Sequence, residues 1–184
     1  LIYSELINIL KKQGRGKIFD DFLQKKNIFT KKLLLQCIKK YRYNQADLKP
    51  YQSAVKFLEK NKDKSIYLVT DGNKNVQAHK VKLLKLNKCF KKIFITHRYG
   101  IDKAKPSLYC FEKIKKIEKC RWEDLVYIGD NPLKDFVSLK KVNAKTIRLL
   151  KGNYSDTIVS EEYEAQSRIH SLDELSSEIK KLFK

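Results

Sequence analysis

Residues 66–73, IYLVTDGN, place a short apolar run directly before a threonine, an acid and a glycine. A run of this length that ends in turn residues is typical of a strand buried on both faces. Three similar runs follow, each after a segment in which apolar residues recur with helical spacing. The predicted strands cover residues 66–69, 93–96, 125–128 and 146–149, and the predicted helices between them cover 74–86, 107–118 and 132–140.

Short strands that alternate with amphipathic helices predict an α/β fold with a parallel sheet built from right-handed βαβ units. The chain has 184 residues, of which 42% are hydrophobic and 34% charged, with only 6 Gly and 3 Pro. This composition excludes a disordered or fibrous protein, and the length suits one well-buried domain, or one domain with a smaller insertion. The apolar runs are far too short to span a membrane, so no membrane partner is expected.

Residues 1–48 have a different pattern, which is helical and contains no convincing strand. Thr30 is a good candidate for a helix N-cap in this part. A boundary is expected directly before Pro50, because the residue that precedes a proline is disfavoured in helical geometry. Residues 49–184 then form the α/β unit. Its last part, residues 163–184, predicts a short strand and a closing helix that begins with Ser171 as the cap and Glu174 three residues later.

The formal net charge of +20 raises the question of a nucleic-acid partner. The lysines are spread from Lys11 to Lys184, mostly as pairs on helix faces, without the interleaved aromatic residues and glycines of an RNA-binding module. We therefore expect no specific nucleic-acid binding. The 4 cysteines and 3 histidines are too scattered for a zinc site or a disulfide framework, and this predicts reduced thiols and a cytoplasmic location.

Ligands of open parallel sheets bind outside the carboxyl ends of the strands, so the residues that follow each apolar run are the first candidates for a site. Thr70 ends the first run, and Gly72 and Asn73 follow it. A hydroxyl group before a glycine turn can bind a phosphate oxygen together with backbone N–H groups. An ordinary turn in which Asn73 caps the next helix is an equally good interpretation of these residues alone.

The run at 125–128 is followed by Gly129, Asp130, Asn131 and Pro132, with Asp135 five residues after Asp130. Proline suits the first turn of a helix, so we expect Asp130 at the sheet edge and Asp135 one turn into the helix. A carboxylate in the first position is a suitable ligand for Mg²⁺. The alternative is that Asp130 or Asn131 only caps the helix.

Between these two segments, Lys105 precedes Pro106 in the sequence GIDKAKPS, residues 100–107. A cation brought to the same edge of the sheet could offset the charge of a phosphate and of carboxylates. In a chain this rich in lysine a single lysine means little. Its place between two other candidate segments is what singles it out.

Taken together, in this order and spacing, the three segments resemble the last three of the four motifs of the haloacid dehalogenase superfamily, over residues 47 to about 150. The resemblance implies a Rossmann-like doubly wound parallel sheet in residues 49–184 and a partial helical cap in residues 1–48. It also implies a hydrolase that uses Mg²⁺. By this resemblance Thr70 would contact the phosphate, and Gly72 and Asn73 would line the phosphate loop. Lys105 would be the lysine of the third motif, and Asp130 would be the carboxylate that binds Mg²⁺. Asp135 would be the second acid of the fourth motif, which orients the lysine or the metal-bound waters.

The first motif of the superfamily, a strand that ends in an Asp-x-Asp pair with the nucleophile, has no match in residues 1–65. Asp20 and Asp21 are adjacent and lie within a helical pattern, so we interpret them as part of the cap. Asp71 follows a strand, but residue 73 is asparagine. Because the missing strand is central to the sheet of this superfamily, and because the sequence starts at Leu1 and has no methionine, we expect a truncated product or an incomplete record rather than a pseudoenzyme.

The sequence thus predicts that the intact protein is a Mg²⁺-dependent phosphomonoesterase, which works through an aspartyl-phosphate on a small phosphorylated metabolite such as a sugar phosphate or a nucleotide. Two alternatives of other classes stay open. The first is a non-catalytic module that binds phosphate, and the second is a basic nucleic-acid-binding protein whose affinity would fall steeply with salt.

Overall fold

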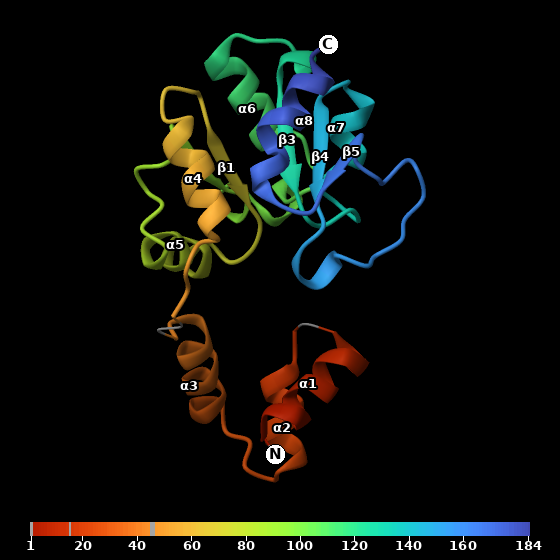
Figure 1. The fold of residues 1–184 in the computed structure, drawn as a ribbon. Helices are drawn as coiled ribbons and strands as arrows, with labels where there is room; N and C mark the ends of the chain where they lie inside the picture. The colour runs from red at the N-terminus through yellow and green to blue at the C-terminus, as the bar shows by residue number, and fades with distance from the viewer. Residues whose placement is uncertain (1, 15, 45–46) are drawn as a thin grey trace. The chain divides into compact units, whose positions relative to one another are not determined.

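A computed structural model describes residues 2–14, 16–44 and 47–184 (Figure 1). The chain divides into two compact units, Leu1–Asp47 and Leu48–Lys184. The division lies in the stretch that precedes Pro50.

The first unit is helical, as the sequence predicts, and its described residues contain no strand. Thr30 caps the third helix, because its side-chain oxygen accepts a hydrogen bond from the backbone N–H of Leu33 at 3.1 Å. Asp20 and Asp21 lie in the first turn of the second helix, not at the end of a strand. The helices are α1 (Ile2–Gln13), α2 (Ile18–Lys25) and α3 (Lys31–Arg42).

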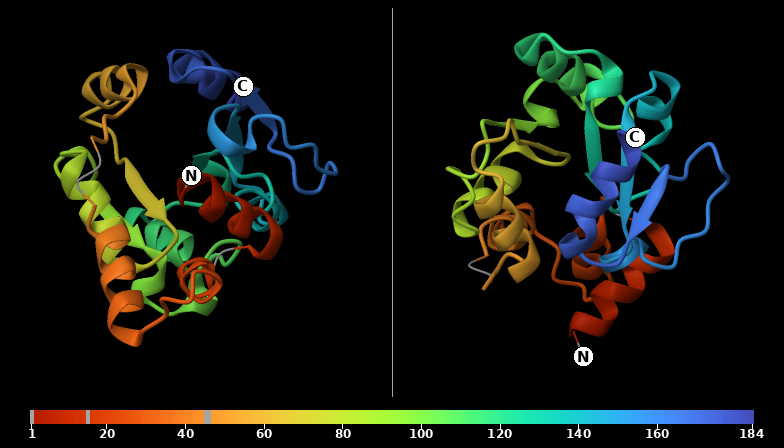
Figure 2. Two further views of the ribbon diagram at one scale, coloured as in Figure 1. Left: turned by 90° about the horizontal axis from the view of Figure 1, so that it is seen from below. Right: turned by 45° about the horizontal axis from the view of Figure 1, so that its top comes forward.

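The second unit contains all the strands, and every pair of neighbouring strands is parallel. The four predicted strands are confirmed with shifts of one residue at most, and a fifth strand forms in the closing segment. The strands are β1 (Tyr67–Thr70), β2 (Lys92–Ile95), β3 (Val126–Gly129), β4 (Lys145–Leu149) and β5 (Ser167–Ile169). They can be followed by colour in the two views of Figure 2.

Helices alternate with the strands of this unit up to β4, and a short 3₁₀ turn at Gly152–Tyr154 lies between β4 and β5. The helices are α4 (Gln52–Lys60), α5 (Lys74–Leu83), α6 (Tyr109–Glu118), α7 (Val137–Lys141) and α8 (Leu175–Leu182). Ser171 and Glu174 form the expected capping box, on a short 3₁₀ turn that leads into α8. Within the described part of the chain, no helix combines the length and the apolar character that crossing a membrane requires.

The strands form two sheets, β1-β2 and β3-β4-β5, and no hydrogen-bonded ladder joins β1 to β3 among the described residues. Side chains join the two sheets instead. One core cluster contains Val69 of β1, Phe94 of β2 and Phe111 of α6, and Tyr127 of β3 packs against it. The same helix therefore supports both sheets from one face.

The opposite face of the second sheet packs on other helices. Ile147 of β4 and Ile169 of β5 are fully buried with Leu175 of α8, and Phe57 of α4 packs against them. Apolar residues that alternate along β3 reach both faces, since Tyr127 joins the first cluster and Ile128 the second. Helices on both faces of parallel strands confirm the predicted Rossmann-like, doubly wound α/β class.

The predicted start of the helix after β3 is wrong. The sequence predicts a helix over residues 132–140, but α7 begins only at Val137, and Asp135 therefore precedes the helix. Local hydrogen bonds explain the difference: the Asn131 side chain accepts from the N–H of Leu133 at 3.1 Å, and the Asp135 side chain accepts from the N–H of Asn131 at 3.0 Å. Short polar side chains that bond nearby backbone groups favour such turns over a helix.

Candidate active site

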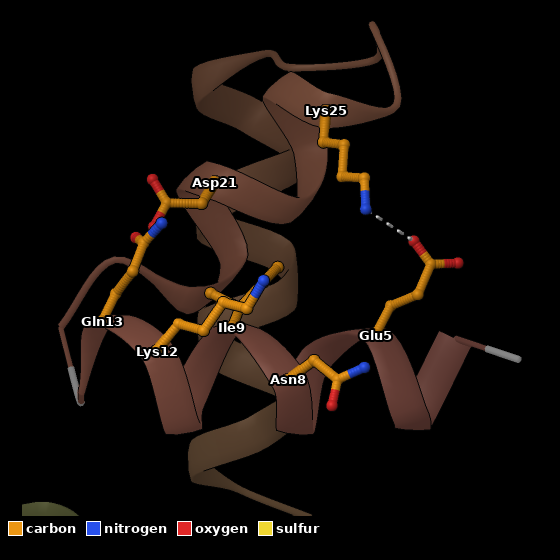
Figure 3. A pocket seen from close by; sticks show the side chains of 7 residues that line it. All are labelled: Glu5, Asn8, Ile9, Lys12, Gln13, Asp21 and Lys25. Carbon is orange, nitrogen blue, oxygen red and sulfur yellow. Dashed lines mark ion pairs between the residues drawn. The ribbon is translucent and has the colours of Figure 1, made fainter.

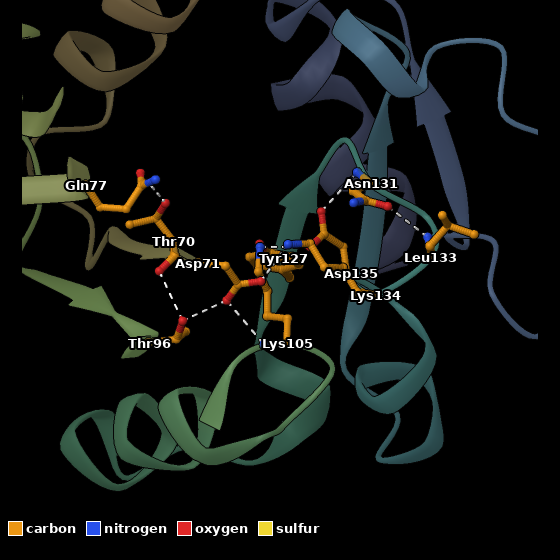
Figure 4. Close-up of polar contacts among 10 residues, drawn as sticks. All are labelled: Thr70, Asp71, Gln77, Thr96, Lys105, Tyr127, Asn131, Leu133, Lys134 and Asp135. Carbon is orange, nitrogen blue, oxygen red and sulfur yellow. Dashed lines mark hydrogen bonds and ion pairs between the residues drawn. The ribbon is translucent and has the colours of Figure 1, made fainter. Parts of the chain in front are cut away.

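The carboxyl ends of the strands bring the candidate residues to one edge of the second unit (Figure 4). Thr70 is the last residue of β1, and Thr96 directly follows β2. Gly129 ends β3 and leads to Asp130, while Lys105 comes from the loop between β2 and α6. The residues that the sequence places after the strands therefore lie at the edge where open parallel sheets bind ligands.

Asp71 joins the loops that follow three different strands. One carboxylate oxygen accepts from the Thr96 hydroxyl at 2.8 Å and from the Lys105 backbone N–H at 3.2 Å. The other oxygen forms an ion pair with the Lys134 ammonium at 2.7 Å. Burial by itself would raise the pKa of Asp71, but the bond to Lys134 and the nearby charge of Lys105 lower it below the ordinary value. Asp71 is therefore an ionised carboxylate that connects the loops after β1, β2 and β3.

Lys105 forms the most buried ion pair at this edge. Its ammonium lies 2.8 Å from the Asp135 carboxylate and donates to the Tyr127 hydroxyl at 2.8 Å. The two charged side chains are only 9% and 2% exposed. Burial alone would lower the pKa of Lys105, yet Tyr127 and Asp135 raise it above the ordinary value, so the lysine is a fixed cation. Burial likewise raises the pKa of Tyr127, to about 12, which keeps its phenol protonated.

Gly129 is the residue that lets Asp135 approach the strand. A Cβ atom on Gly129 would lie 2.5 Å from Oδ2 of Asp135, which is closer than atoms can approach. The second oxygen of Asp135 bonds the backbone N–H of Asn131, while the first contacts Lys105. The small residue, the turn and the lysine thus position one buried carboxylate. Of the two functions predicted for Asp135, orienting the lysine or orienting waters on a metal, its contacts favour the first, and its catalytic role stays a prediction.

The residues predicted to bind phosphate make local contacts. The Thr70 hydroxyl lies 3.1 Å from the side-chain oxygen of Gln77, and Gly72 has a positive φ of 124°. The Asn73 side chain accepts from the N–H groups of Asn75 and Val76 and so caps α5. The capping role that the sequence left open for Asn73 is therefore present, and a phosphate role of these three residues stays a prediction.

The Asp130 carboxylate is exposed at the end of β3. Among the described residues, no group of three or more His, Cys, Asp or Glu side chains is arranged to hold a metal ion. Mg²⁺ is commonly bound through one or two protein carboxylates and completed by waters and substrate phosphate oxygens. The Asp130 carboxylate, which forms no ion pair within the described part of the chain, fits such a partial ligand set, whereas Asp135 is engaged by Lys105.

The helical unit has a cavity of its own, of about 350 Å³ (Figure 3). Six of its seven lining residues have polar or charged side chains, and Glu5 and Lys25 form an ion pair of 3.9 Å on one side. The residues of this cavity all belong to the helical unit, and none of them is one of the predicted site residues. The lining residues are Glu5, Asn8, Ile9, Lys12, Gln13, Asp21 and Lys25.

Sequence reasoning missed several residues of the network. Lys105 and Asp135 were both predicted and do form a pair, but Asp71, Thr96, Tyr127 and Lys134 were not proposed as members. Asp71 and Thr96 could have been found, because each lies at the carboxyl end of a predicted strand, within two residues of its last position. Tyr127 and Lys134 could not, because a tyrosine within a strand and one lysine among 41 basic residues give no signal of their own.

The comparison with known families agrees with this geometry. A family model described as haloacid dehalogenase-like hydrolase matches residues 4–149, most of the chain. The chain belongs to this family. The superfamily resemblance seen in the three strand-end segments is thereby confirmed, and so is the hydrolase class.

Two relatives of this haloacid dehalogenase-like chain are named glyceraldehyde 3-phosphate phosphatase. The protein from Methanocaldococcus jannaschii is 31% identical over 192 aligned residues, which cover 99% of this chain and 82% of the relative. The protein from Pyrococcus furiosus is 29% identical over 89 residues, which cover 48% of this chain and 36% of the relative.

Solved structures of the family share the fold. The HAD-hydrolase YfnB from Bacillus subtilis, bound to magnesium, has a TM-score of 0.67 at 20% identity, with 97% of this chain and 79% of that chain covered. A HAD phosphatase from Thermococcus onnurineus has a TM-score of 0.62 at 21% identity, with 96% and 78% covered. At these identities the likeness concerns the fold alone.

Proposed function

We propose that this chain is the main part of a Mg²⁺-dependent phosphomonoesterase that acts on a small phosphorylated metabolite. The observation that carries the proposal is the buried Lys105 cation, which Asp135 and Tyr127 hold at the carboxyl edge of the strands. A fixed, buried cation stabilises the negative charge of a phosphoryl group without reorganisation during the reaction. The relative named glyceraldehyde 3-phosphate phosphatase supports a sugar phosphate as the substrate.

The reaction in this proposal has two steps. An aspartate attacks phosphorus and releases the alcohol, and water then hydrolyses the aspartyl-phosphate. The sequence contains no Asp-x-Asp pair, so we propose that the nucleophile lies outside these 184 residues, on a strand that pairs with the free edges of β1 and β3. The separation of the strands into two sheets supports this position.

The residues of this chain would act on the phosphate group. Lys105 would neutralise its charge, and the Thr70 hydroxyl with the backbone around Gly72 would donate hydrogen bonds to its oxygens. Asp130 would hold the Mg²⁺ ion, which when bound supplies further charge neutralisation at the phosphate oxygens. Asp135 and Asp71 would hold Lys105 by its side chain and by its backbone, respectively. A cytoplasmic location remains part of the proposal.

The test is phosphate release from a panel of small phosphate monoesters with MgCl₂. It compares this chain with a version that carries an additional N-terminal strand ending in Asp-x-Asp. We expect turnover only in the longer protein, and we expect Asp130→Asn to abolish it. Asp63→Asn, at an exposed turn, is the control and should leave the rate unchanged. If the longer protein folds and is inert toward all esters, the hydrolase proposal fails and a non-catalytic phosphate-binding module becomes the better account.

A further inference from the structure

A second cavity, of about 320 Å³, lies beside Asp130 at the carboxyl ends of β3 and β4. Its volume is at the lower end of the range for small-molecule sites. The apolar part of its lining comes from Ile128, Leu149 and Leu172, and its polar part includes Asp130 and Lys151. The aromatic ring of Tyr51 also lines it. The cavity therefore combines a place for a few carbon atoms with one cationic side chain, Lys151, and the carboxylate of Asp130.

Lys151 is held in place without being neutralised. Its ammonium lies 4.8 Å from the ring centroid of Tyr51, a cation–π contact that fixes its direction. In the described ranges, no carboxylate forms an ion pair with Lys151. An ammonium of this kind keeps its N–H groups for a ligand oxygen.

A buried arginine, Arg148, holds the loop that carries Lys151 through hydrogen bonds to its backbone. Arg148 is only 2% exposed, and its guanidinium donates to the carbonyl oxygens of Tyr154 at 2.6 Å and Thr157 at 2.8 Å. It also forms an ion pair of 2.6 Å with Glu164. These bonds fix the chain directly after Lys151.

The same loop runs past the Asp130 carboxylate. Gly152, next to Lys151, has a φ of 78°, and a Cβ atom there would lie 4.0 Å from an Asp130 oxygen. The positive φ is a conformation that glycine adopts readily. The loop backbone thus passes beside the acid that we assign to the metal, and Lys151 enters the cavity from a fixed point next to it.

We propose that Lys151 and Tyr51 form the subsite for the leaving-group part of the substrate. This inference rests on the proposed function, since it takes the phosphate to lie at Lys105 and Asp130. The matching ligand is a short-chain phosphate ester that carries a carboxylate or carbonyl oxygen at the end opposite the phosphate. Its carbon chain packs on the apolar wall and the Tyr51 ring, and its terminal oxygen accepts a hydrogen bond from the Lys151 ammonium. Lys151 is thus a specificity-determining residue.

The experiment measures the binding of three probes to the full chain with MgCl₂ by calorimetry. The probes are orthophosphate, propyl phosphate and 3-phosphoglycerate, of which only the last has the terminal carboxylate. We expect 3-phosphoglycerate to bind more tightly than propyl phosphate. Lys151→Met should weaken 3-phosphoglycerate by roughly 10- to 100-fold, the range for a hydrogen bond to a charged group, while orthophosphate and propyl phosphate bind as before.

Two further variants separate this role from a structural one. Lys151→Arg should keep most of the affinity, and Lys145→Met, at the opposite end of β4, should keep all of it. If orthophosphate binds but Lys151→Met weakens all three probes equally or none of them, the subsite is refuted and the phosphate site survives. If no probe binds to the folded chain, both the phosphate site and the subsite fail.

Discussion

Replacing Lys105 by methionine should destabilise the second unit strongly, because it leaves the Asp135 carboxylate buried without its cation. At an effective dielectric constant of about 20, two unit charges 2.8 Å apart attract by about 6 kcal/mol. Burial of the two charges offsets much of this attraction. The loss on removing one partner of a buried pair is typically about 3 to 5 kcal/mol. We expect Lys105→Met to lower the free energy of unfolding by that amount.

A double-mutant cycle isolates the pair. Asp135→Asn removes the charge but keeps an acceptor for the Asn131 N–H, and the double variant leaves no unpaired charge. We therefore expect the double variant to be more stable than Lys105→Met alone, with a coupling of about 2 kcal/mol or more. The exposed pair of Lys103 and Asp102, with an N–O distance of 2.7 Å, comes from the same loop. It is the control, and its coupling should be too small to resolve.

The assay is urea unfolding followed by the fluorescence of Trp122. This is the single tryptophan of the chain, and it packs against the core cluster of the second unit. It therefore reports on that unit alone. If the two substitutions add to within about 0.5 kcal/mol, the reasoning about a buried, mutually dependent pair is refuted.

Two further predictions concern the same network. Gly129→Ala should cost about 1 to 3 kcal/mol, since the new methyl group would meet the Asp135 side chain, which cannot move without breaking its contact with Lys105; an unchanged urea midpoint would contradict this. The native pKa of Asp71 is lowered, so its stabilising contribution is present above its ordinary pKa of 3.8 and is lost as the pH falls through the native value. When the pH is lowered from roughly 5 to 3, the free energy of unfolding of Asp71→Asn should therefore fall less than that of the native protein. If the free energies of unfolding of the two proteins fall equally with pH, this role of Asp71 is excluded.

The strands were predictable because each is a short apolar run bounded by turn residues, and all four lie within one residue of their predicted positions. The start of α7 was not predictable from periodicity. Pro132 is compatible with both a helical turn and an irregular turn, and the choice depends on where the side chains of Asn131 and Asp135 find hydrogen-bond partners. Both partners are backbone N–H groups of the turn itself, and the Asp135 carboxylate is also held by Lys105, 30 residues earlier in the sequence.

The candidate site was predictable only in part for a similar reason. Lys105 and Asp135 could be singled out because they belong to segments that follow strands in a meaningful order. Asp71 was considered only as a candidate nucleophile. Its contacts with Thr96 and Lys134, which connect the loops after three strands, could not be seen in the sequence. Those partners come from distant segments, and their proximity is a property of the folded sheet edge.

The edges of β1 and β3 also affect how the protein behaves in concentrated solution. Strand edges without a neighbour are templates on which other chains can pair, whereas a net charge of +20 keeps identical molecules apart. Salt shortens the range of this repulsion from about 10 Å at 0.1 M to about 3 Å at 1 M. Light scattering should therefore show self-association that increases with ionic strength. The lysine-rich surface therefore acts as a colloidal stabiliser while the edges of β1 and β3 lack a strand partner, as they do among the described residues.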